Sequence, residues 1–133
     1  MIMVSREGSI GDAVEAILAL PGSENIEFIS FFGSVSQHKS HSGSDIDICI
    51  YYGGAEKEAL NFLLRAMFSI NSSTFDLKLF RELPLYIRID VLKGRILYSK
   101  ELSRVYEIAH ETMREYEDFE PRFYDYIGKE EIH

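Results

Sequence analysis

The chain has 133 residues, of which 46% are hydrophobic and 27% charged, and its formal net charge is −8. No apolar run approaches the ~20 residues that are needed to cross a bilayer, and the negative charge disfavours a nucleic-acid-binding surface, which normally requires clustered basic residues. Size and composition are typical of a globular protein, so we expect one domain over residues 1–133, with a helical and aromatic C-terminal part from about residue 100.

The N-terminal stretch lacks a long apolar region behind a basic start, so we expect no signal peptide. The single cysteine, Cys49, excludes an intrachain disulfide, and we expect it in a buried strand as a small apolar residue. Both features favour a reducing cytoplasm as the location.

The first half of the chain predicts a helix followed by two strands. Ile10, Val14, Ile17 and Leu18 recur at helical spacing, and Pro21-Gly22-Ser23 ends this segment. An apolar strand follows at 26–32, then the polar residues 35–43, and a second apolar strand over 44–51.

The second strand begins with two aspartates, Asp45 and Asp47, two positions apart. Residues i and i+2 of a strand point to the same face, so both carboxylates project from one face. Two such carboxylates repel each other unless a cation lies between them. Magnesium commonly binds one or two carboxylates together with substrate phosphates, so the pattern predicts a divalent-metal site.

Gly33 and Ser34 follow the first strand and predict a phosphate-binding turn. Glycine lets the backbone approach a ligand closely, and backbone N–H groups with a hydroxyl can hold phosphate. The alternative is a hairpin with solvated aspartates. In the spacer, His38 and His41 raise the question of a zinc site, but exposed loop residues are the simpler interpretation.

The second half predicts a helix over 55–70 and a strand over 74–80. The helix carries an apolar stripe that we expect to pack on the sheet: Leu60, Leu63, Leu64, Met67 and Phe68. In the strand, alternation separates Phe75, Leu77 and Leu79 from Asp76 and Lys78 on the other face.

Residues 83–94 are ambiguous, because the alternation of Leu85, Ile87, Ile89 and Val91 favours a strand, whereas Pro84 and Gly94 mark the two ends of a helix. From residue 100 a helical stripe follows, which comprises Leu102, Val105, Tyr106, Ala109, Met113 and Tyr116. We expect this helix to break or kink near Pro121. The aromatic stretch 119–126 packs on the domain or contacts a partner.

Gly33-Ser34, the ten-residue spacer 35–44 and Asp45-Ile46-Asp47 together resemble the signature of the DNA polymerase beta-type nucleotidyltransferase superfamily, and in particular of its minimal nucleotidyltransferase (MNT) family. Phe31-Phe32 and Ser44 also match. The resemblance implies an α/β (α+β) fold: a small mixed β-sheet with helices packed on it and a C-terminal helix. It also implies a short helix near 85–93 and a strand at 95–98, which resolves the ambiguous segment.

The resemblance further implies the roles of individual residues. One or two Mg²⁺ ions would bind the catalytic carboxylates Asp45, Asp47 and, by its position, Asp76, which can also take the acceptor's proton. ATP would be the substrate, bound by Gly33, Ser34, Lys39 and Ser44. The alternative for Asp76 is an exposed strand aspartate paired with Lys78. Gln37 and His38 stand where the family commonly has arginine and glycine, which leaves the nucleotide preference open.

MNT proteins are often antitoxins of HEPN-domain toxins, which they silence by transferring AMP to a tyrosine hydroxyl. The resemblance therefore implies nucleotidyl transfer to a HEPN-type partner. Two alternatives remain: transfer to a small molecule, or a non-catalytic partner-binding module with a degenerate site. The sequence leaves the oligomeric state open, a homo-oligomer included.

Overall fold

The computed structural model describes the backbone of residues 6–32, 46–70 and 74–127, and the side chains of residues 10–32, 46–70 and 74–118. The helices and strands follow in chain order as α1 (Arg6–Leu18), β1 (Ile26–Phe32), β2 (Ile46–Tyr52), α2 (Glu56–Ser69), β3 (Phe75–Leu79), α3 (Leu85–Lys93), β4 (Arg95–Ser99) and α4 (Leu102–Ile127). Two short 3-10 helices, η1 (Ser23–Asn25) and η2 (Phe80–Glu82), precede β1 and follow β3.

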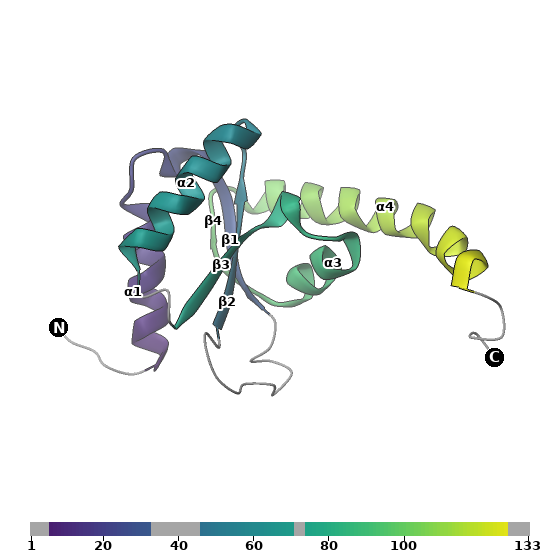
Figure 1. Ribbon diagram of the computed structural model, residues 1–133, viewed down its shortest axis with the longest axis horizontal. Coiled ribbons are helices and arrows are strands. Elements are labelled where there is room, and N and C mark those ends of the chain that lie inside the picture. Colours follow the sequence, from purple (N-terminus) through teal and green to yellow (C-terminus); the bar gives the residue numbers. More distant parts are fainter. Residues whose placement is uncertain (1–5, 33–45, 71–73, 128–133) are drawn as a thin grey trace.

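The four strands form one mixed sheet in the order β3-β2-β1-β4. β1 runs antiparallel to both of its neighbours, β2 and β4, whereas β2 and β3 run parallel. Helices α1 and α2 lie on one side of this sheet and α3 and α4 on the other, with the far end of α4 extending away from the body (Figure 1). The predicted α/β fold, a mixed sheet covered by helices with a C-terminal helix, is confirmed.

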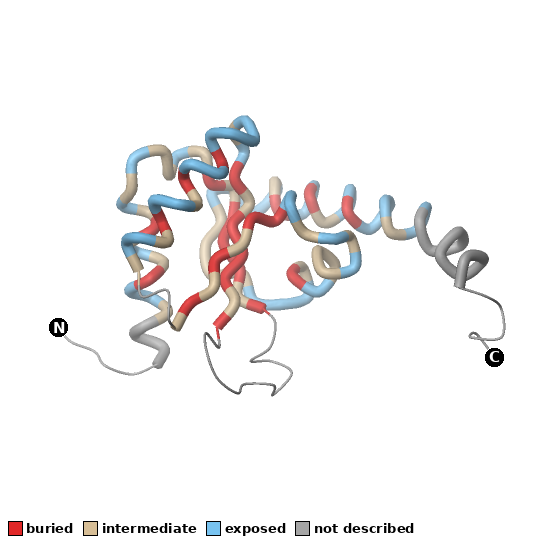
Figure 2. Tube along the Cα trace, viewed as in Figure 1, coloured by how far each residue is buried: buried red, intermediate tan, exposed pale blue. Residues whose placement is uncertain are grey.

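Alternation along the strands sends apolar side chains to both faces and creates two cores. The first core lies under α1 and α2 and includes Ile29, Ile48, Ile50 and Leu77. The second core lies under α3 and α4 and consists of Phe28, Phe32, Cys49, Phe80, Val91, Val105 and Ile108. Figure 2 shows the resulting concentration of buried residues along the sheet. Cys49 is buried in a strand, as predicted.

Helix α2 packs through a different face from the predicted one. Its buried side chains are Ala59, Phe62 and Ala66, whereas Leu60, Leu64 and Phe68 are 51%, 48% and 90% exposed. Of the predicted stripe, Leu63 and Met67 pack against the core at its border. The physical reason is that two alanines let the helix approach the sheet closely around one large ring, so the largest side chains do not mark the buried face.

Helix α4 also differs from the prediction in two respects. It buries Val105, Ile108 and Thr112 against the body, whereas Leu102, Tyr106 and Met113 are exposed. The helix does not break at Pro121, because it continues to Ile127, and the alternative of a kink there stays a prediction. A helix can pass through a proline when packing elsewhere offsets one lost backbone hydrogen bond.

The ambiguous segment forms helix α3, and the strand predicted after it is β4. Pro84 precedes the helix and Gly94 follows it, so the terminal residues decide the conformation against the alternating pattern. Among the described helices, none is long and apolar enough to cross a membrane.

Candidate functional site

The predicted site residues divide into two groups. Five of them lie outside the residues that the structure describes: Gly33, Ser34, Lys39, Ser44 and Asp45. The spacer residues Gln37, His38 and His41, which raised the question of zinc, lie outside them too. Asp47 and Asp76 are described, and they are 29 positions apart in the sequence.

The sheet brings Asp47 and Asp76 together. β2 and β3 are parallel neighbours, and their register pairs Asp47 directly with Asp76. Adjacent strands lie about 4.8 Å apart, and paired residues of parallel strands point to the same face. Both carboxylates therefore project side by side from the face that α3 and α4 cover, and both side chains are partly exposed.

Lys78 completes this arrangement of charges. It lies two positions after Asp76 on the same face of β3, and its Nζ donates a hydrogen bond to Asp76 Oδ2 at 3.0 Å. The side chains of Lys78 and Asp76 are 42% and 37% exposed. The alternative interpretation of Asp76, a strand aspartate paired with Lys78, is thus correct about the pairing, but the same aspartate also lies beside Asp47.

The neighbouring residue pair shows where the apolar core begins. Cys49 is paired with Lys78 across the strands, and burial raises the pKa of the Cys49 thiol, an effect that the nearby Lys78 ammonium partly offsets. On the other side, Ser30 pairs with Cys49, and its buried hydroxyl has no hydrogen-bond partner among the described residues. On this face of β2, the partly exposed Asp47 is therefore followed, two positions later, by Cys49 of the second core.

These carboxylates suit a hard divalent cation. Carboxylate oxygens on two neighbouring strands are ligands of the kind that Mg²⁺ prefers, so Asp47 and Asp76 would contribute to holding such an ion. The ammonium of Lys78 already sits against Asp76, which shows that a cation is accommodated there. Among the described residues there is no cluster of three or more His, Cys, Asp or Glu side chains that could hold a metal.

A groove of about 630 Å³ lies further along the same face, between η2, α3 and α4. Its lining includes Tyr51, Phe80, Arg81, Arg88, Thr112 and Glu115. Sequence reasoning missed this groove, although Tyr51 lies four positions after Asp47 and two after Cys49 on the same face of β2, so continued alternation along this strand would have indicated that Tyr51 lines it.

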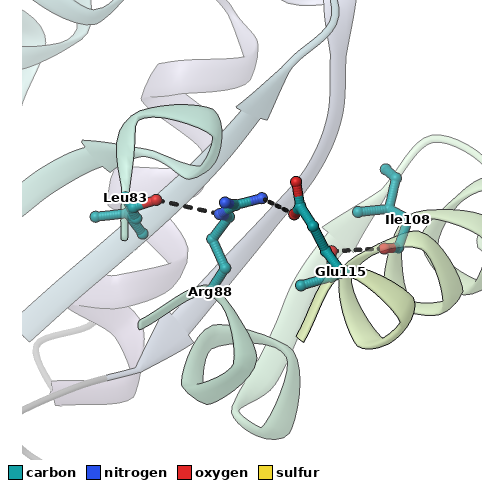
Figure 3. A network of polar contacts seen from close by, with 5 residues as sticks. Leu83, Arg88, Ile108 and Glu115 are labelled. Carbon is teal, nitrogen blue, oxygen red and sulfur yellow. Dashed lines mark hydrogen bonds and ion pairs between the residues drawn. The ribbon is translucent and has the colours of Figure 1, made fainter. Parts of the chain in front are cut away.

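Arg88 ties the walls of this groove together. Its Nε donates to the Leu83 carbonyl at 3.1 Å and its Nη1 donates to Glu115 Oε1 at 3.0 Å, which links α3 and the turn before it to α4 (Figure 3). The Arg88–Glu115 ion pair therefore bridges α3 and α4 along the lining of this groove.

Comparisons with known proteins agree with this geometry. The sequence model described as "Polymerase beta, Nucleotidyltransferase" matches residues 15–103. A protein of Methanocaldococcus jannaschii that is named as a protein adenylyltransferase is 31% identical over 75 residues, which are 56% of this chain and 57% of that protein. The chain thus spans somewhat more than half the length of this curated relative.

Solved structures with the same fold come from toxin–antitoxin complexes. A chain of a complex crystallised with AMP-PNP has a TM-score of 0.64 at 19% identity, over 97% of this chain and 100% of that one. A chain of an MntA–HepT complex has a TM-score of 0.65 at 15% identity, over 96% and 100%. A chain of a complex between a tri-AMPylated HEPN toxin of Shewanella oneidensis and its MNT antitoxin has a TM-score of 0.61 at 17% identity, over 96% of each chain.

The family match extends over most of the chain, from the end of α1 to the start of α4, and includes both strands that carry Asp47 and Asp76. This protein therefore belongs to the polymerase beta-type nucleotidyltransferase family.

Proposed function

We propose that this protein is a metal-dependent nucleotidyltransferase that moves AMP from ATP to a tyrosine hydroxyl of a HEPN-domain partner, with pyrophosphate as the leaving group, and that it acts as the antitoxin of that partner. The observation that carries the proposal is the direct pairing of Asp47 with Asp76 on a face of the family's sheet. The relative named as a protein adenylyltransferase and the AMPylated toxin in a complex of similar fold support the choice of AMP and of a protein acceptor.

In this proposal the chain mainly positions groups. Asp45, Asp47 and Asp76 would hold one or two Mg²⁺ ions, and Gly33, Ser34, Lys39 and Ser44 would hold the nucleotide. Bound magnesium would supply charge neutralisation at the reacting phosphate. Asp76 would lie next to the acceptor hydroxyl and accept its proton. Asp47 would lie beside Asp76, because the register of β2 and β3 pairs the two residues.

A binding-only module is the second candidate, because Gln37 and His38 depart from the arginine and glycine that the family commonly has in the spacer. Under this alternative the chain would hold its partner through its surface without transferring a nucleotide.

The test uses ATP labelled at the α-phosphate, Mg²⁺ and an extract of the source cells. We expect label on one small protein and an at least about 100-fold lower amount of this label with Asp47→Asn or Asp76→Asn, because each variant removes a carboxylate that would hold the metal at the reacting phosphate. Asp12→Asn on the exposed side of α1 is the matched control and should retain activity. Label on a small molecule would redirect the proposal to another acceptor, and no label on any fraction, with partner binding retained, would favour the binding-only module.

A further inference from the structure

We propose that Lys78 is an internal cation that competes with the divalent metal for Asp76, so that metal binding requires the Lys78–Asp76 ion pair to open. This inference rests on the proposed function, since it assigns a role in the same site. It concerns the resting protein, however, and can be measured without nucleotide or acceptor.

The contact geometry places Lys78 in competition with a metal. Its Nζ lies 3.0 Å from Asp76 Oδ2. A magnesium or manganese ion would bind a carboxylate oxygen at about 2.1 Å. An ammonium and a divalent ion that share one carboxylate at these distances repel each other strongly, so the two cations exclude each other from the same position.

The position of Lys78 on the sheet directs its ammonium toward the carboxylates. Lys78 is paired with the buried Cys49, whereas Asp76 is paired with Asp47. Because Cys49 belongs to the apolar core, the charged end of Lys78 turns away from it and toward Asp76, two positions earlier on β3. There it meets Asp76 and the edge of the site.

The other ion pairs found in the described part of the chain lack this feature. Arg104 pairs with Glu107 within α4, and Arg88 joins α3 to α4 through Glu115. Neither acid has an aspartate beside it on a neighbouring strand. The Lys78–Asp76 pair is placed where two carboxylates meet, so a cation there offsets their repulsion in the absence of metal.

The competition predicts a counterintuitive result: removal of a cation tightens binding of another cation. An ion pair with this exposure is worth at most about 1 kcal/mol, which corresponds to a change in Kd of up to about fivefold. We therefore expect Lys78→Met to bind Mn²⁺ about threefold more tightly than the wild type. Lys78→Arg keeps the charge and the pairing, so its affinity should stay near that of the wild type.

The experiment measures free Mn²⁺ by electron paramagnetic resonance during titration of the intact protein, without nucleotide. Lys57→Met is the matched control, because it removes the same charge from an exposed position on α2, on the opposite side of the sheet. Urea unfolding of each variant establishes that it is folded. Tighter binding in Lys78→Met, unchanged binding in Lys57→Met and loss of the gain in Lys78→Met/Asp47→Asn would support the proposal.

Two results would overturn it, and they differ in their meaning. Equal or weaker Mn²⁺ binding in Lys78→Met, with binding still dependent on Asp47, would reject the competition and leave the proposed metal site intact. Mn²⁺ binding that does not change with Asp47→Asn would reject the metal site itself, and the role of Lys78 with it.

Discussion

Gly94 sits at a close approach between the end of α3 and the end of β1, and replacing it by alanine should strain both. A Cβ at this position would lie 2.6 Å from the Phe31 carbonyl oxygen, 3.2 Å from the Val91 carbonyl oxygen and 3.3 Å from Phe32 Cβ. Real Cβ contacts are essentially never below 3.0 Å, so the Phe31 oxygen has to move by at least about 0.4 Å. Phe31 is paired with Arg95 in β4, so this shift displaces strand backbone rather than a side chain.

We expect Gly94→Ala to lower the free energy of unfolding by about 1–3 kcal/mol, the usual cost of overpacking. For a chain of this size this loss corresponds to a decrease in Tm of roughly 3–15 °C. Urea unfolding followed by circular dichroism measures the free energy, and amide hydrogen exchange should show faster opening at the end of β1.

Gly11→Ala is the control, and it should change the free energy of unfolding in the opposite direction. Gly11 lies in α1, and no atom comes within 4 Å of a Cβ built there. Alanine is a better helix former than glycine, so Gly11→Ala should raise the free energy of unfolding by about 0.5–1 kcal/mol. The packing argument would be refuted if Gly94→Ala had a free energy of unfolding within about 0.5 kcal/mol of the wild type.

Three further predictions concern stability. Burial raises the pKa of the Cys49 thiol above its ordinary value of about 9, so above pH 9 this thiol ionises in the unfolded chain but stays neutral in the folded one. Relative to Cys49→Ala, the free energy of unfolding of the wild type, measured with urea, should therefore fall by about 1.4 kcal/mol between pH 8 and pH 10. Phe62→Ala removes a fully buried ring and should cost about 3–5 kcal/mol, whereas Phe68→Ser, at 90% exposure, should stay within about 0.5 kcal/mol; equal losses in thermal melts would contradict the assigned face of α2. A double-mutant cycle of Arg88→Met and Glu115→Gln should give a coupling free energy below about 1 kcal/mol, because Glu115 is 59% exposed. A larger value would contradict this expectation and show that the ion pair attaches α4 to α3 more strongly.

Local patterns predicted the strands and the face to which Asp47 points. Asp47 faces away from Ile48 because strand side chains alternate, and this needs no knowledge of the rest of the chain. The pairing of Asp47 with Asp76 is different, because it depends on which strands become neighbours and in which register. From the sequence, Asp76 was assigned to the site only through the family resemblance. In the structure, the parallel pairing of β2 and β3 explains why it lies beside Asp47.

Helices were harder to predict than strands, because their buried faces depend on the surface that they meet. In α2 the sheet accepts Ala59 and Ala66 and leaves Leu64 in solvent, so a pattern of large apolar residues selects the wrong face. In α3 the alternating residues favoured a strand, but the proline before the helix and Gly94 after it outweighed them. In α4 the buried positions Ile108 and Thr112 are set by contact with the body, and a threonine among them is invisible to a hydrophobicity pattern.

The two cores on opposite sides of one sheet have a consequence for how this family can diverge. The core under α1 and α2 contains none of the proposed catalytic groups, and it needs only apolar volume of the right amount, which many combinations of side chains provide. Substitutions can accumulate there as compensated exchanges while the opposite face keeps its charged residues. Chains that share only 15–19% of their residues with this one and still have its fold are what such exchanges would produce.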